Sequence, residues 1–364
     1  MDTLIITIND KRNYGNRLQN WALSRVLSRR GTCKTASTLL DGDLAKGRGT
    51  LARERAAHVR DLLRRGSAGH DAAVRHAAVE RFDRRWGLNG PVLTFRGGLS
   101  GRWRPDTVVI GSDQVWNAMW ASPDDLSLRL GMNFDGLSVV SYAASVGTEN
   151  VPEWAVPAFR EGIARMGAVS VREDRAADVL GGIIGRPVTV VADPVALLTP
   201  EEWRFVFPGT VDGRKPFALE YFLGEPSIEQ RAAMDVFESE NGLAARRAGA
   251  PGDPSAGAGP GSLAELACRA SAVFTDSYHG CLLALIFGTP VKAFARRGLP
   301  QGLDMSSRMR TLDRALGLGG ALSSSDDAAP FEPGLSVERA LRGERERSLG
   351  WLGAALEEVR HDGR

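Results

Sequence analysis

A short apolar run, a polar turn and a longer apolar run near the C-terminus constrain the fold of this chain most strongly. The first run, Ala272–Phe274, is typical of a buried strand. The polar turn Thr275–Gly280 follows, and the second run, Cys281–Phe287, ends at Gly288 as a helix does. In an open α/β sheet, a turn between a strand and a helix lies at the carboxyl end of the strand, where ligands bind.

This turn contains His279, one of only five histidines in the chain. The free backbone N–H groups at a helix N-terminus form a site for an anion. An imidazole with an ordinary pKa of about 6.5 accepts and donates protons at neutral pH. We therefore predict that His279 is catalytic. The alternative is a structural histidine whose polar atoms are satisfied by the turn.

The length of 364 residues predicts two domains, because a single core seldom exceeds about 250–300 residues. We place an N-terminal domain at residues 1–206 and a C-terminal domain at residues 207–335. Residues 336–364 read as an amphipathic helix that packs back across both domains.

Composition narrows the class of protein. A hydrophobic content of 43% and a charged content of 25% are those of a soluble globular protein. The net charge of +2 gives no reason to expect a nucleic-acid partner. Cys33, Cys268 and Cys281 are widely spaced, so we expect reduced thiols and no metal site. There is no transmembrane stretch of about 18–20 apolar residues and no leader before the first strand, so we expect a cytoplasmic protein.

Apolar strands that run into polar or glycine turns and then into helices recur along the chain. In the N-terminal part we expect strands at 3–9, 32–38, 107–110, 137–143, 169–172 and 188–192. In the C-terminal part we expect strands at 216–222, 243–246 and 272–274, and helices at 227–240, 262–269 and 307–316. This alternation indicates an α/β fold with two Rossmann-like, doubly wound domains facing a cleft, which is the GT-B architecture.

Two regions carry no chemistry that we can assign. Residues 41–85 are charged and rich in alanine, which indicates helices with much exposed surface. Residues 248–261 are rich in Gly, Ala and Pro, which indicates a loop.

Seven short motifs occur in order along the chain. They are NYGNRLQNWAL (13–23), GSDQVWN (111–117), SYAASVG (141–147), VRED (171–174), ADPVALL (192–198), TDSYHG (275–280) and SSRMRTL (306–312). Together they resemble the polysaccharide pyruvyl transferase family from end to end. The resemblance implies a GT-B-like fold and transfer of a pyruvyl group from phosphoenolpyruvate to two hydroxyls of a saccharide, giving a cyclic ketal. It implies phosphoenolpyruvate as co-substrate. We expect no cofactor and no metal, because arginines can supply the charge.

Phosphoenolpyruvate is a small trianion, so its site requires cationic side chains. Arg172, at the end of a strand, is predicted to clamp the donor and act in catalysis, the alternative being a surface pair with Glu173 or Asp174. Arg308, near a helix start, is a second donor candidate, the alternative being an ordinary first-turn residue. We expect Asp276 to orient the ring of His279. The predicted donor residues are Arg172, Ser277, His279, Gly280, Ser307 and Arg308.

The loops of the N-terminal domain are expected to face the acceptor. Asp113 is a candidate second base, and Trp116 is a candidate stacking face for a sugar, with core packing as its alternative. Asp193, before Pro194, reads as a structural turn. The predicted acceptor residues are Asn13, Tyr14, Asn16, Gln19, Ser112, Asp113, Gln114 and Trp116.

Two other functions stay open at this point. The first is a GT-B-fold transferase that uses a nucleotide-sugar or another phosphorylated donor. The second is a relative without activity that binds a ligand or partner, although retention of Arg172, His279 and Arg308 argues against it. The sequence leaves the acceptor and the oligomeric state open.

Overall fold

Two parallel sheets form the centre of the protein. The computed structural model describes residues 1–9, 13–39, 67–94, 98–211, 215–249, 253, 255–298, 306–322 and 329–362. The first sheet has the order β2-β1-β6-β7-β8-β9, and its strands are β1 (Thr3–Ile6), β2 (Cys33–Thr35), β6 (Thr107–Ile110), β7 (Ser138–Ala144), β8 (Ala168–Val171) and β9 (Thr189–Val190). The second has the order β11-β10-β12-β13, with β10 (Phe217–Tyr221), β11 (Ala244–Ala248), β12 (Ala272–Thr275) and β13 (Val291–Ala293).

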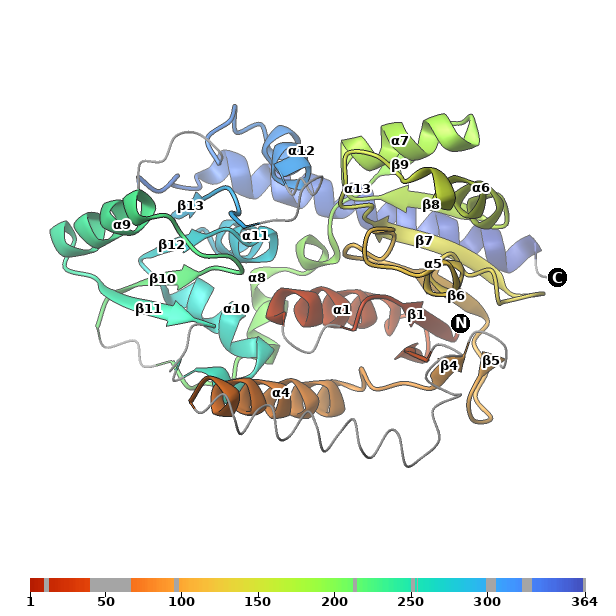
Figure 1. Ribbon diagram of the computed structural model, residues 1–364, viewed down its shortest axis with the longest axis horizontal. Helices are drawn as coiled ribbons and strands as arrows, with labels where there is room; N and C mark the ends of the chain where they lie inside the picture. Colours follow the sequence, from red (N-terminus) through yellow and green to blue (C-terminus); the bar gives the residue numbers. More distant parts are fainter. Residues whose placement is uncertain are drawn as a thin grey trace.

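Helices cover these sheets (Figure 1). The α-helices are α1 (Tyr14–Leu27), α4 (Ser67–Trp86), α5 (Pro123–Arg129), α6 (Val156–Ala164), α7 (Asp174–Ile184), α8 (Pro200–Trp203), α9 (Ile228–Glu240), α10 (Pro260–Arg269), α11 (Tyr278–Phe287), α12 (Ser306–Leu316) and α13 (Leu335–Asp362). Four 3-10 helices are η1 (Glu153–Ala155), η2 (Pro194–Leu197), η3 (Arg204–Val206) and η4 (Ala256–Ala258). A small third sheet contains β3 (Ser37–Leu39), β4 (Val92–Thr94) and β5 (Gly98–Leu99).

The strand sequences explain the parallel topology. β1, β6 and β12 are buried along their whole length, as expected for strands covered by helices on both faces. In β1 the side chains of Leu4 and Ile6 enter one hydrophobic cluster, whereas Ile5 enters another. This alternation follows from the two-residue period of a strand. The predicted α/β fold with two doubly wound parallel sheets is therefore confirmed.

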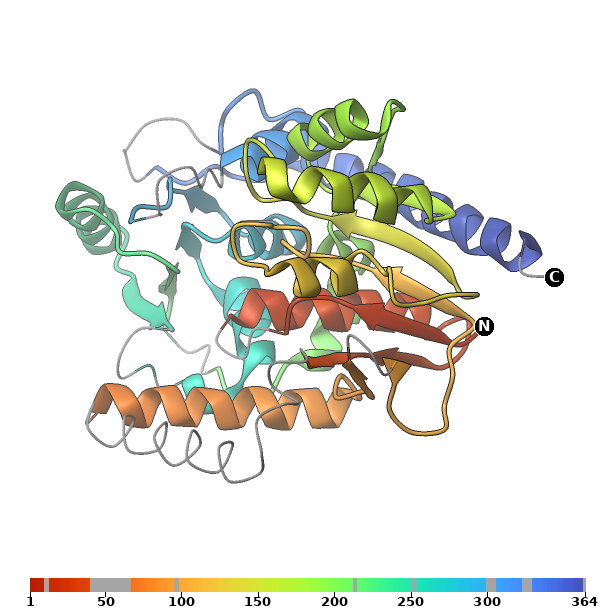
Figure 2. The same ribbon diagram turned by 45° about the vertical axis from the view of Figure 1, so that its right-hand side comes forward.

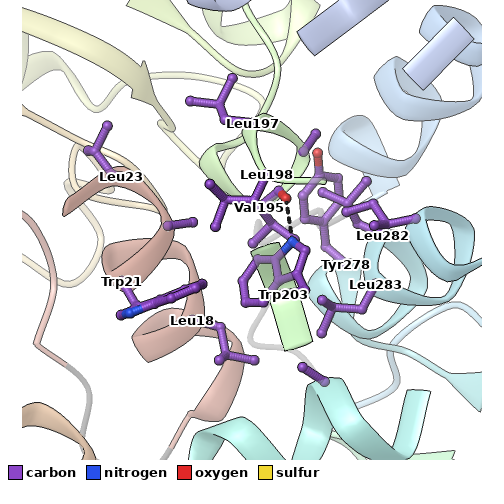
Figure 3. Close-up of a cluster of buried hydrophobic side chains, with 14 of the residues drawn as sticks. Leu18, Trp21, Leu23, Val195, Leu197, Leu198, Trp203, Tyr278, Leu282 and Leu283 are labelled. Atoms are coloured by element: carbon purple, nitrogen blue, oxygen red, sulfur yellow. Dashed lines mark hydrogen bonds between the residues drawn. The ribbon is translucent and has the colours of Figure 1, made fainter. Parts of the chain in front are cut away.

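One continuous apolar cluster joins the elements of the two sheets. Trp203 lies at its centre, between leucines of α1, η2 and α11 (Figure 3). Its indole N–H donates to the carbonyl oxygen of Val195 at 3.1 Å, which satisfies the one polar atom of this buried ring. Replacing such a side chain by alanine costs about 3–5 kcal/mol of folding free energy.

The terminal helix α13 also crosses from one sheet to the other. It packs against β7 of the first sheet and against α11 and α12 beside the second. Figures 1 and 2 show it running along both halves of the molecule, while α4 lies at the edge near α1 and α10. The residue boundaries that we assigned to the domains stay a prediction.

Element boundaries differ from the predictions at functionally relevant points. The helix predicted from Cys281 begins at Tyr278, so His279 belongs to its first turn. The small third sheet was not predicted, because its strands are two or three residues long. Of the predicted helices at 41–85, α4 is present, and residues 41–66 lie outside the described residues.

Candidate active site

A cavity of about 850 Å³ opens between the two sheets. Its wall combines residues of α4 and of the first domain with residues that follow β10, β11 and β12. The lining residues are Ile8, Asn13, Arg75, Asp113, Gln114, Trp120, Glu220, Phe222, Leu223, Gly224, Glu225, Pro226, Arg231, Arg247, Ala248, Gly249, Ser277, Tyr278, His279, Arg296 and Arg308. Loops at the carboxyl ends of parallel strands thus supply much of this wall, as in other open α/β sheets.

His279 is held on this wall by the first turn of α11. The Ser277 hydroxyl caps the helix, accepting from the backbone N–H of Gly280 at 3.3 Å. The Ser277 N–H in turn donates to the Thr275 hydroxyl at 3.0 Å. The imidazole packs against Gly15 of α1, where a Cβ atom would lie only 2.6 Å from His279 Nδ1. Only glycine permits this approach between two distant segments of the chain.

Arg172 lies behind this wall in a cluster of buried carboxylates. Its guanidinium donates to Asp193 at 2.7 Å and to Asp113 at 2.9 Å, and Nε lies 3.6 Å from Glu173 Oε2. Burial would lower the pKa of Arg172, but the three carboxylates raise it above its ordinary value. Burial would likewise raise the pKa of Asp113, which Arg172 and His279 hold below its ordinary range. The alternative of a surface pair with Glu173 or Asp174 is therefore wrong, because Arg172 lies in a buried network.

Asp193 connects that network to the histidine. Its Oδ2 lies 3.6 Å from His279 Nε2, and its Oδ1 accepts from the backbone N–H of Val195 at 2.9 Å. Burial opposes the charge of Asp193, but His279 and Arg172 lower its pKa to about 2. We expected only a structural turn here; the residue caps η2 and also contacts the histidine. Its position directly after the strand expected at 188–192 was the available signal.

Arg308 is a buried cation of this wall that lacks a carboxylate partner within the described part of the chain. Its side chain is buried, and its Nε has no hydrogen-bond partner there. Burial, and then repulsion by Arg172, lower the pKa of Arg308 to about 10. The Tyr278 ring lies 5.8 Å from this guanidinium and 5.3 Å from that of Arg172, so it interacts with both cations. Sequence reasoning did not single out Tyr278.

Among the predicted donor residues, Ser277, His279 and Arg308 line the cavity. Gly280 instead packs closely on the Thr275 hydroxyl, where a Cβ would lie at 2.8 Å. Ser307 is buried and is not among the lining residues. Asp276 does not contact the histidine as we expected. Its carboxylate accepts from the N–H groups of Leu223 and Gly224 and faces Arg296, so it holds a neighbouring loop.

Among the predicted acceptor residues, Asn13, Asp113 and Gln114 line the cavity. Asn16 lies behind them and donates to Asp113 Oδ2 at 2.8 Å. The Ser112 hydroxyl donates to the carbonyl oxygen of Ala143 at 3.1 Å. These two side chains therefore belong to the supporting network.

Three other residues that we predicted to bind the acceptor instead contact the interior of the protein. The Tyr14 hydroxyl donates to the carbonyl oxygen of Ala256 at 2.8 Å, and the Gln19 amide donates to the hydroxyl of Thr7 at 3.3 Å. Trp116 is fully buried and packs edge-on against Phe159. The sugar-stacking role predicted for Trp116 is wrong in this structure, because the indole points into the core; the core-packing alternative holds.

The described residues contain no group of three or more His, Cys, Asp or Glu side chains arranged to hold a metal ion. Nor is any helix in those ranges long and apolar enough to cross a membrane.

Several solved structures are similar to this chain at low sequence identity and low TM-score. The S. aureus MnaA–UDP complex has 13% identity and a TM-score of 0.43, with 96% of this chain and 89% of that chain covered. The UDP-GlcNAc 2-epimerase of Methanocaldococcus jannaschii has 12% identity and a TM-score of 0.45, covering 96% and 93%. Arabidopsis thaliana UGT89C1 with UDP-L-rhamnose has 11% identity and a TM-score of 0.40, covering 98% and 94%. No curated protein matches the chain in sequence.

A family model gives the decisive comparison. The model described as polysaccharide pyruvyl transferase matches residues 13–297, which is most of the chain. The matched range includes Asp113, Arg172, Asp193 and His279, which form the network at and behind the cavity wall. This chain belongs to the polysaccharide pyruvyl transferase family.

Proposed function

We propose that this protein transfers the pyruvyl group of phosphoenolpyruvate to two hydroxyls of a saccharide, forming a cyclic ketal and releasing phosphate. One observation carries the proposal. Arg308, a buried cation without a carboxylate partner in the described ranges, lines the same cavity as His279. A buried cation of this kind is stabilised when an anion binds beside it.

The donor is assigned to the C-terminal side of the cavity. Arg308 supplies a guanidinium suited to bidentate binding of a carboxylate or phosphate. Ser277 lines the same cavity at the start of α11, where the helix dipole also favours an anion. Arg296 lines the same wall at 3.4 Å from Asp276 and adds positive charge.

His279 is the proton-transfer residue in this proposal. Addition of a proton to C3 of phosphoenolpyruvate makes C2 an oxocarbenium-like electrophile, which one acceptor hydroxyl attacks as it loses its proton. Attack on C2 by the second hydroxyl displaces phosphate, which takes up the proton of that hydroxyl, and completes the ketal. An imidazole can donate the first proton and accept one from a hydroxyl. The Asp193 carboxylate, 3.6 Å from Nε2, stabilises the imidazolium form during this exchange.

The geometry changes two predicted roles. Asp113 is a weak base, because Arg172 and Asn16 bind its oxygens and its pKa is lowered. Arg172 has no exposed side-chain surface, and direct contact with the donor would require a carboxylate to release it. We therefore propose that Arg172 holds Asp113 and Asp193 in place and that Arg308 binds the donor.

Calorimetric binding of phosphoenolpyruvate, compared with a panel of nucleotide sugars, tests this function. We expect phosphoenolpyruvate to bind, and Arg308→Ala to weaken binding about 10–100-fold, the usual range for hydrogen bonds to charged groups. Arg310→Ala is the matched control, because Arg310 lies on the same helix with an exposed side chain. Binding of a nucleotide sugar without binding of phosphoenolpyruvate would instead support the alternative donor.

A further inference from the structure

Trp120 is a large aromatic side chain that stays exposed on the wall of the cavity. Its exposed fraction is 49%, whereas Trp116 in the same loop is fully buried. It lines the cavity that contains His279 and Arg308. An aromatic face left open to solvent beside a polar reaction centre is typical of a ligand-binding surface.

Hydrogen bonds within the loop hold Trp120 in position. The backbone N–H of Trp120 donates to the carbonyl oxygen of Asn117 at 3.2 Å, and that of Met119 donates to Asn117 Oδ1 at 3.0 Å. The Asn117 amide donates to Gln114 Oε1 at 2.7 Å. The buried Trp116 therefore anchors a loop that carries Asp113 near the reaction centre and Trp120 at the cavity wall.

A second apolar side chain reaches the cavity from the C-terminal domain. Leu223, which follows β10, is 39% exposed and lines the cavity. The backbone N–H of Leu223 donates to Asp276 Oδ1 at 2.7 Å, so its loop is held as well. Both domains thus present an exposed apolar side chain to a cavity whose other walls carry His279 and Arg308.

We propose that the indole of Trp120 is the platform on which a pyranose ring of the acceptor stacks. This inference rests on the proposed function and names the acceptor as a hexopyranoside unit. The C–H groups on one face of a pyranose match the electron-rich face of an indole, while its hydroxyls stay free at the ring edge. Asn13 and Gln114 line the same cavity and offer hydrogen bonds to that edge. The stacked face then determines which pair of hydroxyls meets the donor.

Direct titration of a panel of methyl hexopyranosides tests the platform by calorimetry, with and without phosphoenolpyruvate. We expect the wild-type protein to bind at least one glycoside, with affinity about tenfold weaker in Trp120→Ala and within about threefold of wild type in Trp120→Phe. Trp154→Ala is the matched control. Trp154 is 46% exposed, lies in η1, and is not among the cavity-lining residues.

The outcomes separate this inference from the proposed function. The platform role is overturned if Trp120→Ala binds the glycoside as tightly as the wild type does. It is also overturned if Trp154→Ala loses as much glycoside affinity as Trp120→Ala, or if the wild type binds no glycoside at about 50 mM. Phosphoenolpyruvate binding is measured separately and reports on the donor assignment. Loss of glycoside affinity with unchanged phosphoenolpyruvate affinity in Trp120→Ala supports the platform. If phosphoenolpyruvate does not bind to the wild type, the proposed function fails while the glycoside titration still decides the role of Trp120.

Discussion

Asp193 Oδ2 lies 3.6 Å from His279 Nε2 and accepts a hydrogen bond from Arg172 at 2.7 Å. Through this carboxylate, the first domain is connected to the histidine of the second. The buried charges of Asp193 and Arg172 are stabilised by each other, so a change in either affects both the fold and the site.

His279→Ala is expected to abolish turnover while phosphoenolpyruvate binding stays within about tenfold of wild type. The variant removes the group that exchanges protons but leaves Arg308 and the N-terminus of α11. Turnover and calorimetric affinity are measured on the same preparation. His76→Ala serves as control, because His76 is an exposed residue of α4. Substantial turnover by His279→Ala would contradict the proton-transfer role.

Asp193→Asn is expected to lower kcat by about 10²–10⁴, since loss of the carboxylate beside a catalytic histidine removes stabilisation of the imidazolium.

The same variant tests how Asp193 contributes to stability at acid pH. The pKa of Asp193 is lowered to about 2 in the folded state, against about 3.9 in an unfolded chain. Its stabilising contribution is therefore fully present above about pH 4 and is lost as the pH falls toward 2.

Urea unfolding at pH 7 and pH 3 measures this effect. The difference in unfolding free energy between wild type and Asp193→Asn should be smaller at pH 3. Asp174→Asn is the control, because Asp174 forms a partly exposed pair with Arg314 that is worth at most about 1 kcal/mol. A difference for Asp193→Asn that does not change with pH would rule out this linkage.

Arg308→Met is expected to raise the free energy of unfolding of the ligand-free protein. Burial and Arg172 lower the pKa of Arg308 to about 10, which means that its charged form is disfavoured in the folded state. The resulting loss of unfolding free energy is fully present below about pH 10. It diminishes as the pH rises toward about 12.5, the pKa of arginine in the unfolded chain. Thermal unfolding at pH 8 compares the variant with Arg310→Met. A lower Tm for Arg308→Met would show that the cation stabilises the empty site.

Gly15→Ala is expected to reduce kcat strongly, with little effect on phosphoenolpyruvate affinity. The added Cβ would lie 2.6 Å from His279 Nδ1 and 2.8 Å from its Cβ, so the imidazole must shift from its present position. Such overpacking usually also costs about 1–3 kcal/mol of stability. Steady-state kinetics and urea unfolding give both quantities.

Gly343→Ala is the matched control for this substitution. Gly343 lies in α13, and a Cβ there meets nothing within 4 Å. Alanine at such a position is expected to stabilise the protein by about 0.5–1 kcal/mol without changing kcat. An unchanged kcat in Gly15→Ala would mean that the contact does not position the histidine.

The sequence by itself determined the fold class and the family. Buried parallel strands are recognised from local runs such as Thr107–Ile110, and the ordered motifs from Asn13 to Leu312 carry the family resemblance. His279 and Arg308 were also predicted from the sequence, because a polar group directly after a strand or at a helix start is a local pattern, and both line the cavity.

Only the tertiary structure decided which residues meet and which way they point. Asp193 follows a strand of the first sheet, whereas His279 follows a strand of the second. No local sequence pattern indicates that the two segments converge. Trp116 and Trp120 occur in one short loop, yet the first packs in the core and the second faces the cavity. The direction of a side chain in a loop depends on backbone angles and distant packing, because a loop lacks the fixed period of a helix or strand.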